Sequence, residues 1–206
     1  MKLVADRLAG ARGGRTLFSG LSFAIEGGEA LLLKGPNGAG KTTLIRMIVG
    51  LLAPAAGRIG LEGGDAELGL GEQCHYVGHL NAVKSSLTVE ENAAFWCRFL
   101  GTPDAGDRIE PALASFGLAE LRDMPAAYLS AGQKRRLSLA RVLLAKRPIW
   151  LLDEPTVSLD RAAQGMLGVA VNEHVAAGGL VVAATHVPLG FAGSRDLELA
   201  GPARPQ

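Results

Sequence analysis

The stretch Gly35-Pro-Asn-Gly-Ala-Gly-Lys-Thr-Thr43 decides the fold, because it fits the phosphate-binding pattern of a glycine, four residues, glycine, lysine and threonine. The buried run Glu29–Lys34 before it predicts a strand, and the apolar-faced run Thr42–Gly50 after it predicts a helix. Glycine lets the backbone approach a polyphosphate closely, and the start of the helix directs N–H groups and its positive dipole end at the anion. The motif therefore has the strand, loop and helix that nucleotide binding requires.

The residue types in this loop have separate tasks. Lys41 would neutralise the β- and γ-phosphates, and the Thr42 hydroxyl would ligate Mg²⁺. A chance match in a glycine-rich chain is the alternative, which the composition puts at roughly 1%. The nucleotide-binding residues expected in the loop are Gly35, Pro36, Asn37, Gly38, Ala39, Gly40, Lys41, Thr42 and Thr43.

The composition is that of a globular chain, with 206 residues, 48% of them hydrophobic and 20% charged. Such a chain forms one large domain or a core with a subdomain. The net charge of +1 gives no general reason to expect nucleic acid as a partner. No apolar run approaches the ~20 residues that span a bilayer, no signal-peptide pattern begins the chain, and its two cysteines fit no disulfide framework. We therefore expect a protein of the reducing cytoplasm that reaches a membrane only by docking on an embedded partner.

Strand and helix patterns alternate at both ends of the chain, with a helical block between them. Strands are expected at residues 3–8, 16–25, 29–34, 58–62, 74–77, 148–153, 180–184 and 195–199. Helices are expected at residues 42–50, 88–100, 108–116, 130–146 and 160–177, and a loop at 63–71. The sequence thus predicts an α/β P-loop NTPase fold in a single domain, 1–206. Its mostly parallel core sheet (1–78 and 148–206) would carry an α-helical subdomain at about 79–147.

Two acids end the apolar strand that leads to Asp153-Glu154-Pro155. In a phosphate-loop protein, a carboxylate at the end of a buried strand holds Mg²⁺ through water, which is the task expected of Asp153. Glu154 can then polarise the attacking water as a general base. The alternative is an ordinary strand-end turn, since Asp, Glu and Pro all favour turns. The phosphate loop upstream favours the catalytic interpretation.

A second phosphate-binding element is expected at Leu129-Ser-Ala-Gly-Gln133, here called the signature segment. Ser130 and Gln133 form a capping-box pattern, so an ordinary helix start is the alternative. The Ser130 hydroxyl, the Gly132 amide and the positive end of the helix also make a phosphate clamp.

The order of these motifs resembles the ATP-binding cassette (ABC) family over essentially the whole chain. The resemblance is carried by the phosphate loop, the signature segment, Leu151-Leu-Asp-Glu-Pro155 and Thr185-His186. It implies a dimeric ATPase in which two chains sandwich two ATP molecules, each held between one chain's phosphate loop and the other's signature segment.

The resemblance also implies tasks for single residues. His186 would sense the γ-phosphate, and Ser158–Asp160 would link the two sites of the dimer. Nucleotide contacts across the interface would come from Ser130, Gly132, Gln133 and Asp160, and the catalytic residues would be Glu154, His186 and His79.

Three positions depart from the family pattern. Arg12 stands where an aromatic residue usually stacks on adenine, and its planar guanidinium can also stack. Ala131 replaces the first glycine of the signature, a mild change. His79 takes the place of a glutamine that approaches Mg²⁺ and the attacking water, because the nearby Gln73 precedes the strand. A histidine at that place can donate or accept one hydrogen bond.

Further stretches are similar to the ATP-binding subunits of bacterial cytochrome c maturation (haem exporter) systems. They are Gly78-His79, Leu87–Asn92, Phe95-Trp96 and Tyr128–Arg136. This resemblance implies an ATPase with ATP and Mg²⁺ as cofactors that powers haem handling or export in c-type cytochrome biogenesis. It also implies a peripheral place on the cytoplasmic face of the bacterial inner membrane. The partners would be a CcmB-like integral membrane permease and further cytochrome c maturation proteins, without nucleic acid.

The sequence leaves open several alternatives to an ATPase of cytochrome c maturation. The ATPase of a small drug or lipid exporter is the nearest, although it is expected to keep the glutamine at position 79. A soluble ABC ATPase acting on nucleic acid generally needs paired cassettes or long insertions, which 206 residues cannot hold. Haem or metal ligands could be drawn from Cys74, His75, His79 and His186, but a cysteine on an apolar strand is more often a small core residue. Phe95 or Trp96 could anchor a membrane subunit or belong to the core of the helical block.

Overall fold

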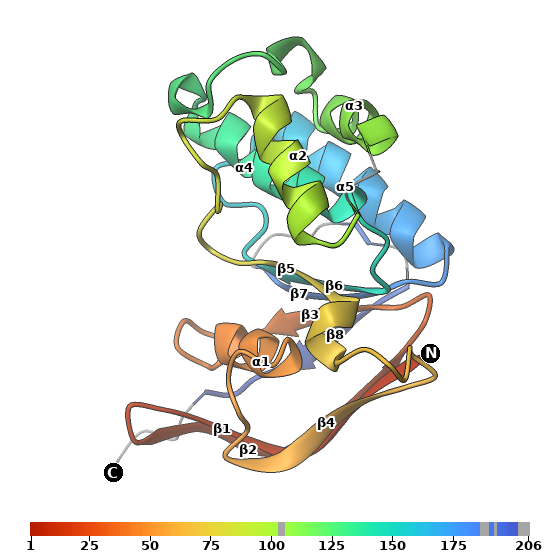
Figure 1. The fold of residues 1–206 in the computed structure, drawn as a ribbon. Coiled ribbons are helices and arrows are strands. Elements are labelled where there is room, and N and C mark those ends of the chain that lie inside the picture. The colour runs from red at the N-terminus through yellow and green to blue at the C-terminus, as the bar shows by residue number, and fades with distance from the viewer. Residues whose placement is uncertain (103–105, 186–189, 192, 202–206) are drawn as a thin grey trace.

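The computed structural model describes residues 1–102, 106–185, 190–191 and 193–201. Two sheets and a layer of helices make up the fold (Figure 1). The central sheet is parallel, with strand order β5-β6-β7-β3-β8. In that order the strands are Cys74–Val77, Ile149–Asp153, Leu180–Ala184, Ala30–Lys34 and Ser194–Glu198. The mostly parallel α/β sheet that the sequence predicts is therefore present.

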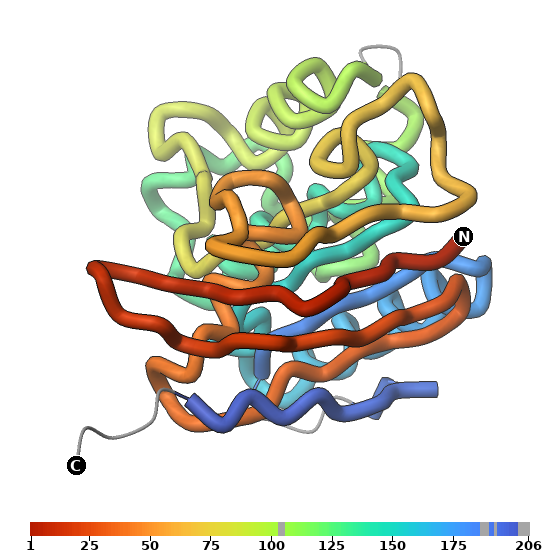
Figure 2. The backbone as a smooth tube through the Cα atoms, turned by 90° about the horizontal axis from the view of Figure 1, so that it is seen from below, coloured from red at the N-terminus to blue at the C-terminus, as the bar shows by residue number. Residues whose placement is uncertain are grey.

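The second sheet is antiparallel and places β1 (Lys2–Arg12) between β2 (Arg15–Glu26) and β4 (Ala56–Glu62). Figure 2 shows it as the outer layer, with the β1–β2 hairpin running across the width of the molecule. β1 continues past its predicted end at residue 8, with irregular register between Ala5 and Ala11. The extra length brings Arg12, at the tip of the hairpin, to the cavity at the phosphate loop.

Helix α1 (Lys41–Ile48) lies between the two sheets (Figure 1). Its apolar side chains pack with buried residues of β1 and with Leu31 and Leu33 of β3. Leu32, between those two leucines, belongs to the other hydrophobic cluster, on the opposite face of the sheet. A strand covered on both faces is apolar throughout, which is why β3 shows no polar alternation.

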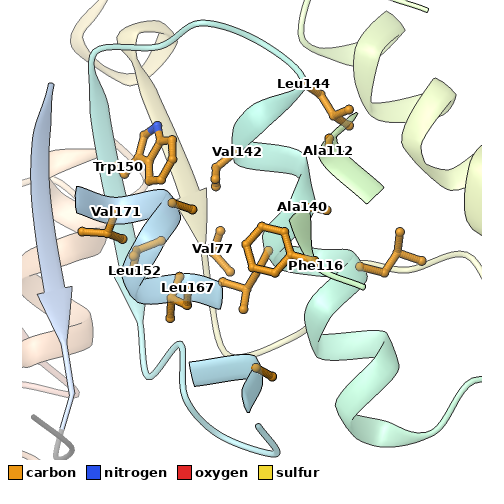
Figure 3. Close-up of a cluster of buried hydrophobic side chains, with 14 of the residues drawn as sticks. Val77, Ala112, Phe116, Ala140, Val142, Leu144, Trp150, Leu152, Leu167 and Val171 are labelled. Atoms are coloured by element: carbon orange, nitrogen blue, oxygen red, sulfur yellow. The ribbon is translucent and has the colours of Figure 1, made fainter. Parts of the chain in front are cut away.

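Four helices cover the other face of the central sheet (Figure 1). They are α2 (Val89–Phe99), α3 (Gly106–Ser115), α4 (Ala131–Ala140) and α5 (Arg161–Ala176). Figure 3 shows the core between them and the sheet, where Trp150 and Leu152 of β6 meet Leu167 and Val171 of α5. None of the helices described is both long and apolar enough to cross a bilayer.

Most predicted elements agree with the structure to within a few residues, but the helix predicted at 130–146 does not. Its α-helical part ends at Ala140, and a 3-10 turn follows at Arg141–Leu143. There the Arg141 side chain turns inward and donates to the backbone carbonyl of Tyr76 on β5. The predicted loop at 63–71 also ends in a short 3-10 helix, Leu70–Gln73. The remaining 3-10 helices described are Ala119–Leu121 and Ala126–Tyr128.

Candidate nucleotide-binding and hydrolysis site

The phosphate loop joins the carboxyl end of β3 to the start of α1, and two of its glycines cannot be replaced without strain. Gly35 has a φ of 125°, and a Cβ there would collide with the carbonyl oxygen of Leu199. Gly40 has a φ of 104°, and a Cβ there would stand 2.9 Å from the ring of Phe18. Glycine at both positions therefore permits a loop conformation and a close packing that any side chain would prevent, and such a glycine-rich loop can cradle a polyphosphate.

The first helix begins without any side-chain cap. Gly40 is its N-cap and has no side chain that could accept from the N–H groups of the first turn. Lys41 is only 7% exposed, and its Nζ donates to the carbonyl oxygens of Gly35 at 2.7 Å and Pro36 at 3.3 Å. A cationic group and uncapped N–H groups therefore face the same loop.

Thr42 and Asp153 meet across the end of the sheet. The Thr42 hydroxyl donates to Oδ1 of Asp153 at 3.0 Å, and Asp153 is 2% exposed at the end of β6. Hydroxyl and carboxylate oxygens are the ligands that Mg²⁺ prefers. The donor set therefore fits the predicted magnesium site.

Glu154 follows in a left-handed backbone conformation, with a φ of 47°. Its N–H donates to the carbonyl oxygen of Ala184 at the end of β7, at 2.8 Å. Glu154 also lines one cavity of about 290 Å³ together with the phosphate loop. The other lining residues are Arg12, Leu17, Asn37, Gly38, Ala39, Gly40, Lys41, Thr42 and Thr43. The structure thus brings most of the predicted nucleotide-binding residues and the predicted base to one place.

A buried arginine lies directly behind the two acids. Arg135 of α4 donates to the backbone carbonyl oxygens of Asp153 at 3.1 Å and Glu154 at 2.8 Å. Burial lowers the pKa of its guanidinium, and the carboxylates of Asp153 and Glu154 act in the opposite direction. The sequence places Arg135 in a basic run but assigns it no task.

The signature segment forms a separate site at the start of α4. The Ser130 hydroxyl accepts from the Gln133 N–H at 3.2 Å, and the Gln133 side chain accepts from the Ser130 N–H at 2.8 Å. A Cβ on Gly132 would stand 2.9 Å from the carbonyl oxygen of Ser158, whose φ is 67°. Asp160 caps α5 by accepting from the Ala163 N–H at 2.8 Å.

These signature residues line a second cavity, of about 260 Å³. Its lining residues are Ser130, Gly132, Gln133, Arg136, Ser158, Leu159, Asp160 and Ala163. It shares no lining residue with the phosphate-loop cavity. Within one chain, therefore, the two predicted phosphate-binding elements line different cavities.

The predicted histidines fall in different positions. His79 is exposed directly after β5, on the loop that Gly78 begins. His186 lies outside the described residues, while Thr185 before it is buried. Gln73 is buried and bonds to Asp65 and Leu68, so its amide organises the preceding loop and not the site.

Cys74 and His75 do not converge on a haem or metal ion. As neighbours on β5, they point to opposite faces of the sheet. His75 Nε2 bonds to the carbonyl of Ala145 at 2.8 Å, and burial lowers its pKa to about 4. Burial raises the pKa of the Cys74 thiol to about 12, which disfavours the thiolate that a metal needs. No cluster of three or more metal-ligating side chains occurs among the described residues.

The proposed membrane anchors are half-buried. Phe95 and Trp96 pack edge to face, with ring centroids 5.6 Å apart, and Trp96 lies against the helical core. Phe99, one turn after Phe95, is 68% exposed but is not among the anchors that the sequence predicts. Its spacing of four residues from Phe95 is the signal that would have found it.

The sequence pattern of the ABC transporter family matches residues 18–157. The chain belongs to the ABC transporter family. Solved structures agree with this. The ATP-binding subunit of an ABC transporter superimposes on this ABC protein with a TM-score of 0.79 and 28% identity, covering 90% of this chain and 80% of that one. An ABC transporter ATP-binding protein from Pyrococcus furiosus gives a TM-score of 0.84 and 25% identity, covering 97% and 98%. The predicted ABC-type P-loop fold is thereby confirmed, and nucleotide binding follows from the family.

Nearer relatives of this ABC protein carry the name cytochrome c biogenesis ATP-binding export protein CcmA. The relative from Bradyrhizobium diazoefficiens is 54% identical over 203 residues, covering 98% of this chain and 99% of the relative. The relative from Rhizobium meliloti is 50% identical over 204 residues, covering 98% and 99%. The predicted resemblance to the ATP-binding subunits of cytochrome c maturation systems is thereby confirmed.

Proposed function

We propose that this chain is the ATP-hydrolysing subunit of a membrane ABC transporter that handles or exports haem in c-type cytochrome biogenesis. The observation that carries the ATPase assignment is the single cavity at which the phosphate loop, Arg12 and Glu154 meet. The names of the relatives that align over nearly the whole chain support the cellular process.

Binding of ATP would rest on the uncapped start of α1. The N–H groups of the loop donate to the phosphate oxygens, and the Lys41 ammonium neutralises the β- and γ-phosphates. Arg12, which lines the same cavity, offers a planar guanidinium for stacking on adenine. The Thr42 hydroxyl and the Asp153 carboxylate would hold Mg²⁺, which would neutralise part of the phosphate charge.

Hydrolysis would use Glu154 as the general base. Its carboxylate accepts a proton from the attacking water while the water oxygen bonds to the γ-phosphorus and ADP departs. His79 and His186 are the proposed polar contacts to the water and the γ-phosphate. We assign them on the resemblance of the motifs, supported for His79 by its position directly after β5.

A second copy of the chain would complete each site. The Ser130 hydroxyl and the Gly132 amide line a different cavity from Lys41, so one chain does not offer both sets of groups to one phosphate. In a head-to-tail dimer, the signature segment of one chain, together with Gln133 and Asp160, would face the γ-phosphate held by the other. Closure would then be favoured by ATP and lost after hydrolysis, because only ATP presents a γ-phosphate to both chains.

The membrane partner would be a CcmB-like permease, with this chain bound at the cytoplasmic face of the inner membrane as a peripheral subunit. We propose the helical subdomain, about 79–147, as the docking region. Its apolar surface supports this, since Leu80 and Phe99 are largely exposed and Phe95 lies beside Phe99 with ring centroids 6.1 Å apart. Exposed aromatic side chains are typical anchors of protein interfaces.

The hydrolysis proposal is tested with Glu154→Gln, which keeps the shape of the side chain and removes the base. We expect phosphate release to fall by roughly 10² to 10⁴ while binding of labelled ATP is retained. Release at the unchanged rate by the folded variant would show that Glu154 is not the base. Absence of ATP hydrolysis in the unaltered chain, alone and with its membrane partner, would refute the ATPase assignment itself.

The docking proposal is tested with Phe99→Ser, with Leu51→Ser as the matched control. Both residues are exposed, but Leu51 follows α1 on the other side of the central sheet. We expect Phe99→Ser to lower co-purification with the permease by roughly tenfold, the loss of a hot-spot contact. Equal co-purification of both variants would exclude Phe99 as an anchor.

A further inference from the structure

The guanidinium of Arg135 uses every donor that it has. Arg135 is 3% exposed, and an arginine side chain carries five N–H donors in a fixed plane. Nε donates to the carbonyl oxygen of Pro155 at 3.2 Å. Nη2 donates to the carbonyl oxygens of Asp153 at 3.1 Å and Glu154 at 2.8 Å. Nη1 donates to the carbonyl oxygen of Gly78 at 2.9 Å and to Oδ1 of Asn81 at 3.3 Å.

The five acceptors come from only two segments of chain. Residues 153–155 carry the proposed magnesium ligand and the proposed base, and residues 78–81 carry His79. Four of the five acceptors are backbone carbonyl oxygens. Arg135 therefore fixes the course of the main chain in both segments, and through it the positions from which the reactive side chains project.

The backbone conformation of Glu154 shows why the main chain must be held in place here. A φ of 47° is uncommon for a residue with a side chain, and such a conformation persists only where its surroundings hold it. The N–H of Glu154 donates to Ala184 at 2.8 Å, and its carbonyl oxygen accepts from Arg135 at 2.8 Å and from the Val157 N–H at 3.3 Å. Removing the Arg135 contact would leave the carbonyl with only the longer of its two contacts, so the turn could relax toward an ordinary φ and move the carboxylate.

Arg135 also belongs to α4, the helix that begins with the signature segment at Ser130. One side chain thus links the start of α4 to the acids at the end of β6 and to the loop after β5. An arginine that merely filled the core would contribute to stability alone.

We propose that Arg135 is a positioning residue for ATP hydrolysis, which holds the Glu154 carboxylate and the His79 loop in register with the signature helix. The inference rests on the proposed ATPase function. Lysine cannot take its place, because an ammonium has three donors around one point and cannot reach two segments with a planar fork.

The test compares Arg135→Lys with Arg141→Lys in the full chain. Arg141 is a matched control, because it is also buried, at 5% exposure, but it bonds to Tyr76 and lies 4.6 Å from the centre of the Trp96 ring. For each variant, kcat is expressed per bound nucleotide, and Tm, ATP affinity and KM are measured beside it. Counting only the chains that bind ATP removes the effect of partial unfolding.

We expect Arg135→Lys to lower kcat per bound nucleotide by roughly tenfold to a hundredfold, the effect of a misplaced catalytic group, with ATP affinity and KM within about twofold. We expect Arg141→Lys to lower Tm and leave kcat within about twofold. Equal kcat in both variants would overturn the inference. Hydrolysis by the unaltered chain separates that result from a failure of the proposed function.

If Arg135→Lys does not fold, Asn81→Ala tests the positioning role of Arg135 instead. It removes one of the five acceptors and leaves the arginine in place. We expect kcat to fall by about two- to fivefold with Tm almost unchanged, the size of one weakened hydrogen bond. An unchanged kcat in folded Asn81→Ala would also overturn the inference.

Discussion

The starts of α1 and α4 face the same kind of ligand in the proposed function, yet they are built in opposite ways. α1 begins at a glycine with no side-chain cap and with Lys41 folded onto the loop carbonyls. α4 begins at Ser130 with a complete capping box, in which the Gln133 side chain accepts from the Ser130 N–H and the Ser130 hydroxyl accepts from the Gln133 N–H. The N-cap of the first start satisfies no N–H group with a side chain, whereas the capping box of the second satisfies two.

In the proposed dimer, this difference would let one chain hold half of each site. The phosphate loop is buried at its α1 end, where Ala39, Gly40 and Lys41 lie. In the signature segment Ser130 and Ala131 are exposed and Gly132 is half-buried, so the proposal makes the Ser130 hydroxyl and the Gly132 amide available to a second chain. Substitutions at the two helix starts, at a buried histidine and at a second capped helix test this contrast.

Lys41→Met should have the largest effect. It removes the cation from the phosphate loop but keeps the length and apolar stem of the side chain. We expect ATP affinity to fall by roughly 10² to 10³, the size found when a charge-stabilising donor is lost, and hydrolysis to be abolished. Isothermal titration with ATP measures this, with Lys2→Met on the exposed end of β1 as control. Unimpaired binding by Lys41→Met would contradict the tasks given to the α1 start.

Ser130→Ala should slow ATP hydrolysis and leave ATP binding unchanged. We expect kcat to fall by roughly tenfold to a hundredfold, the loss of one hydrogen bond to a charged group, while the ATP affinity of the single chain is unchanged. Steady-state hydrolysis with a binding titration separates the two. If affinity falls together with kcat, the signature segment touches the nucleotide held by its own chain, and the contrast between the two starts is wrong.

Acid should lower the stability of the fold through His75, which belongs to neither the α1 start nor the α4 start. Burial lowers its pKa to about 4, with Arg147, Arg141 and His174 lowering it further and the Ala145 carbonyl raising it. The unfolded chain then binds a proton that the fold excludes, so stability is full above about pH 6.5 and falls as pH drops toward 4. At pH 5 the loss is about 2 kcal/mol. Urea unfolding at pH 7.5 and pH 5 should show a larger loss in the natural chain than in His75→Gln, which keeps His174, whose pKa burial also lowers. The same acid sensitivity in both would exclude His75 as its source.

Thr88→Ala should have the smallest effect and is the counterpart of Ser130→Ala. Thr88 and Glu91 cap α2 with the same geometry, at 3.1 and 2.8 Å, as Ser130 and Gln133 cap α4. We expect a loss of about 1 kcal/mol, or a Tm lower by roughly 2–4 °C, without any change in kcat. Differential scanning calorimetry and an ATPase assay measure both. A loss of kcat equal to that of Ser130→Ala would mean that the latter reports only helix stability.

Parts of the fold and of the candidate site that depend on contacts between sequence neighbours were predictable. The loop from Gly35 to Thr43 and the cap of α2 depend on residues that are neighbours in sequence, and both were found from spacing alone. β5 was predicted with its observed bounds, because turn-forming residues precede it and a glycine follows.

Long-range contacts were not predictable in the same way. The acceptors of Arg135 lie 18 to 20 and 54 to 57 residues away, and four of them are backbone carbonyls that carry no residue identity. The early end of α4 likewise coincides with the contact of Arg141 to Tyr76, 65 residues before it. Long-range contacts to backbone carbonyls therefore leave no recognisable pattern in the sequence.

The central proposal is that two chains share each site, and the mass of Glu154→Gln in solution tests it most directly. Sedimentation of this variant with ATP and Mg²⁺ should show a dimer that returns to monomer when ATP is replaced by ADP, or when Ser130→Ala and Gly132→Asp are added. A variant that binds ATP and stays monomeric at every concentration would contradict the account.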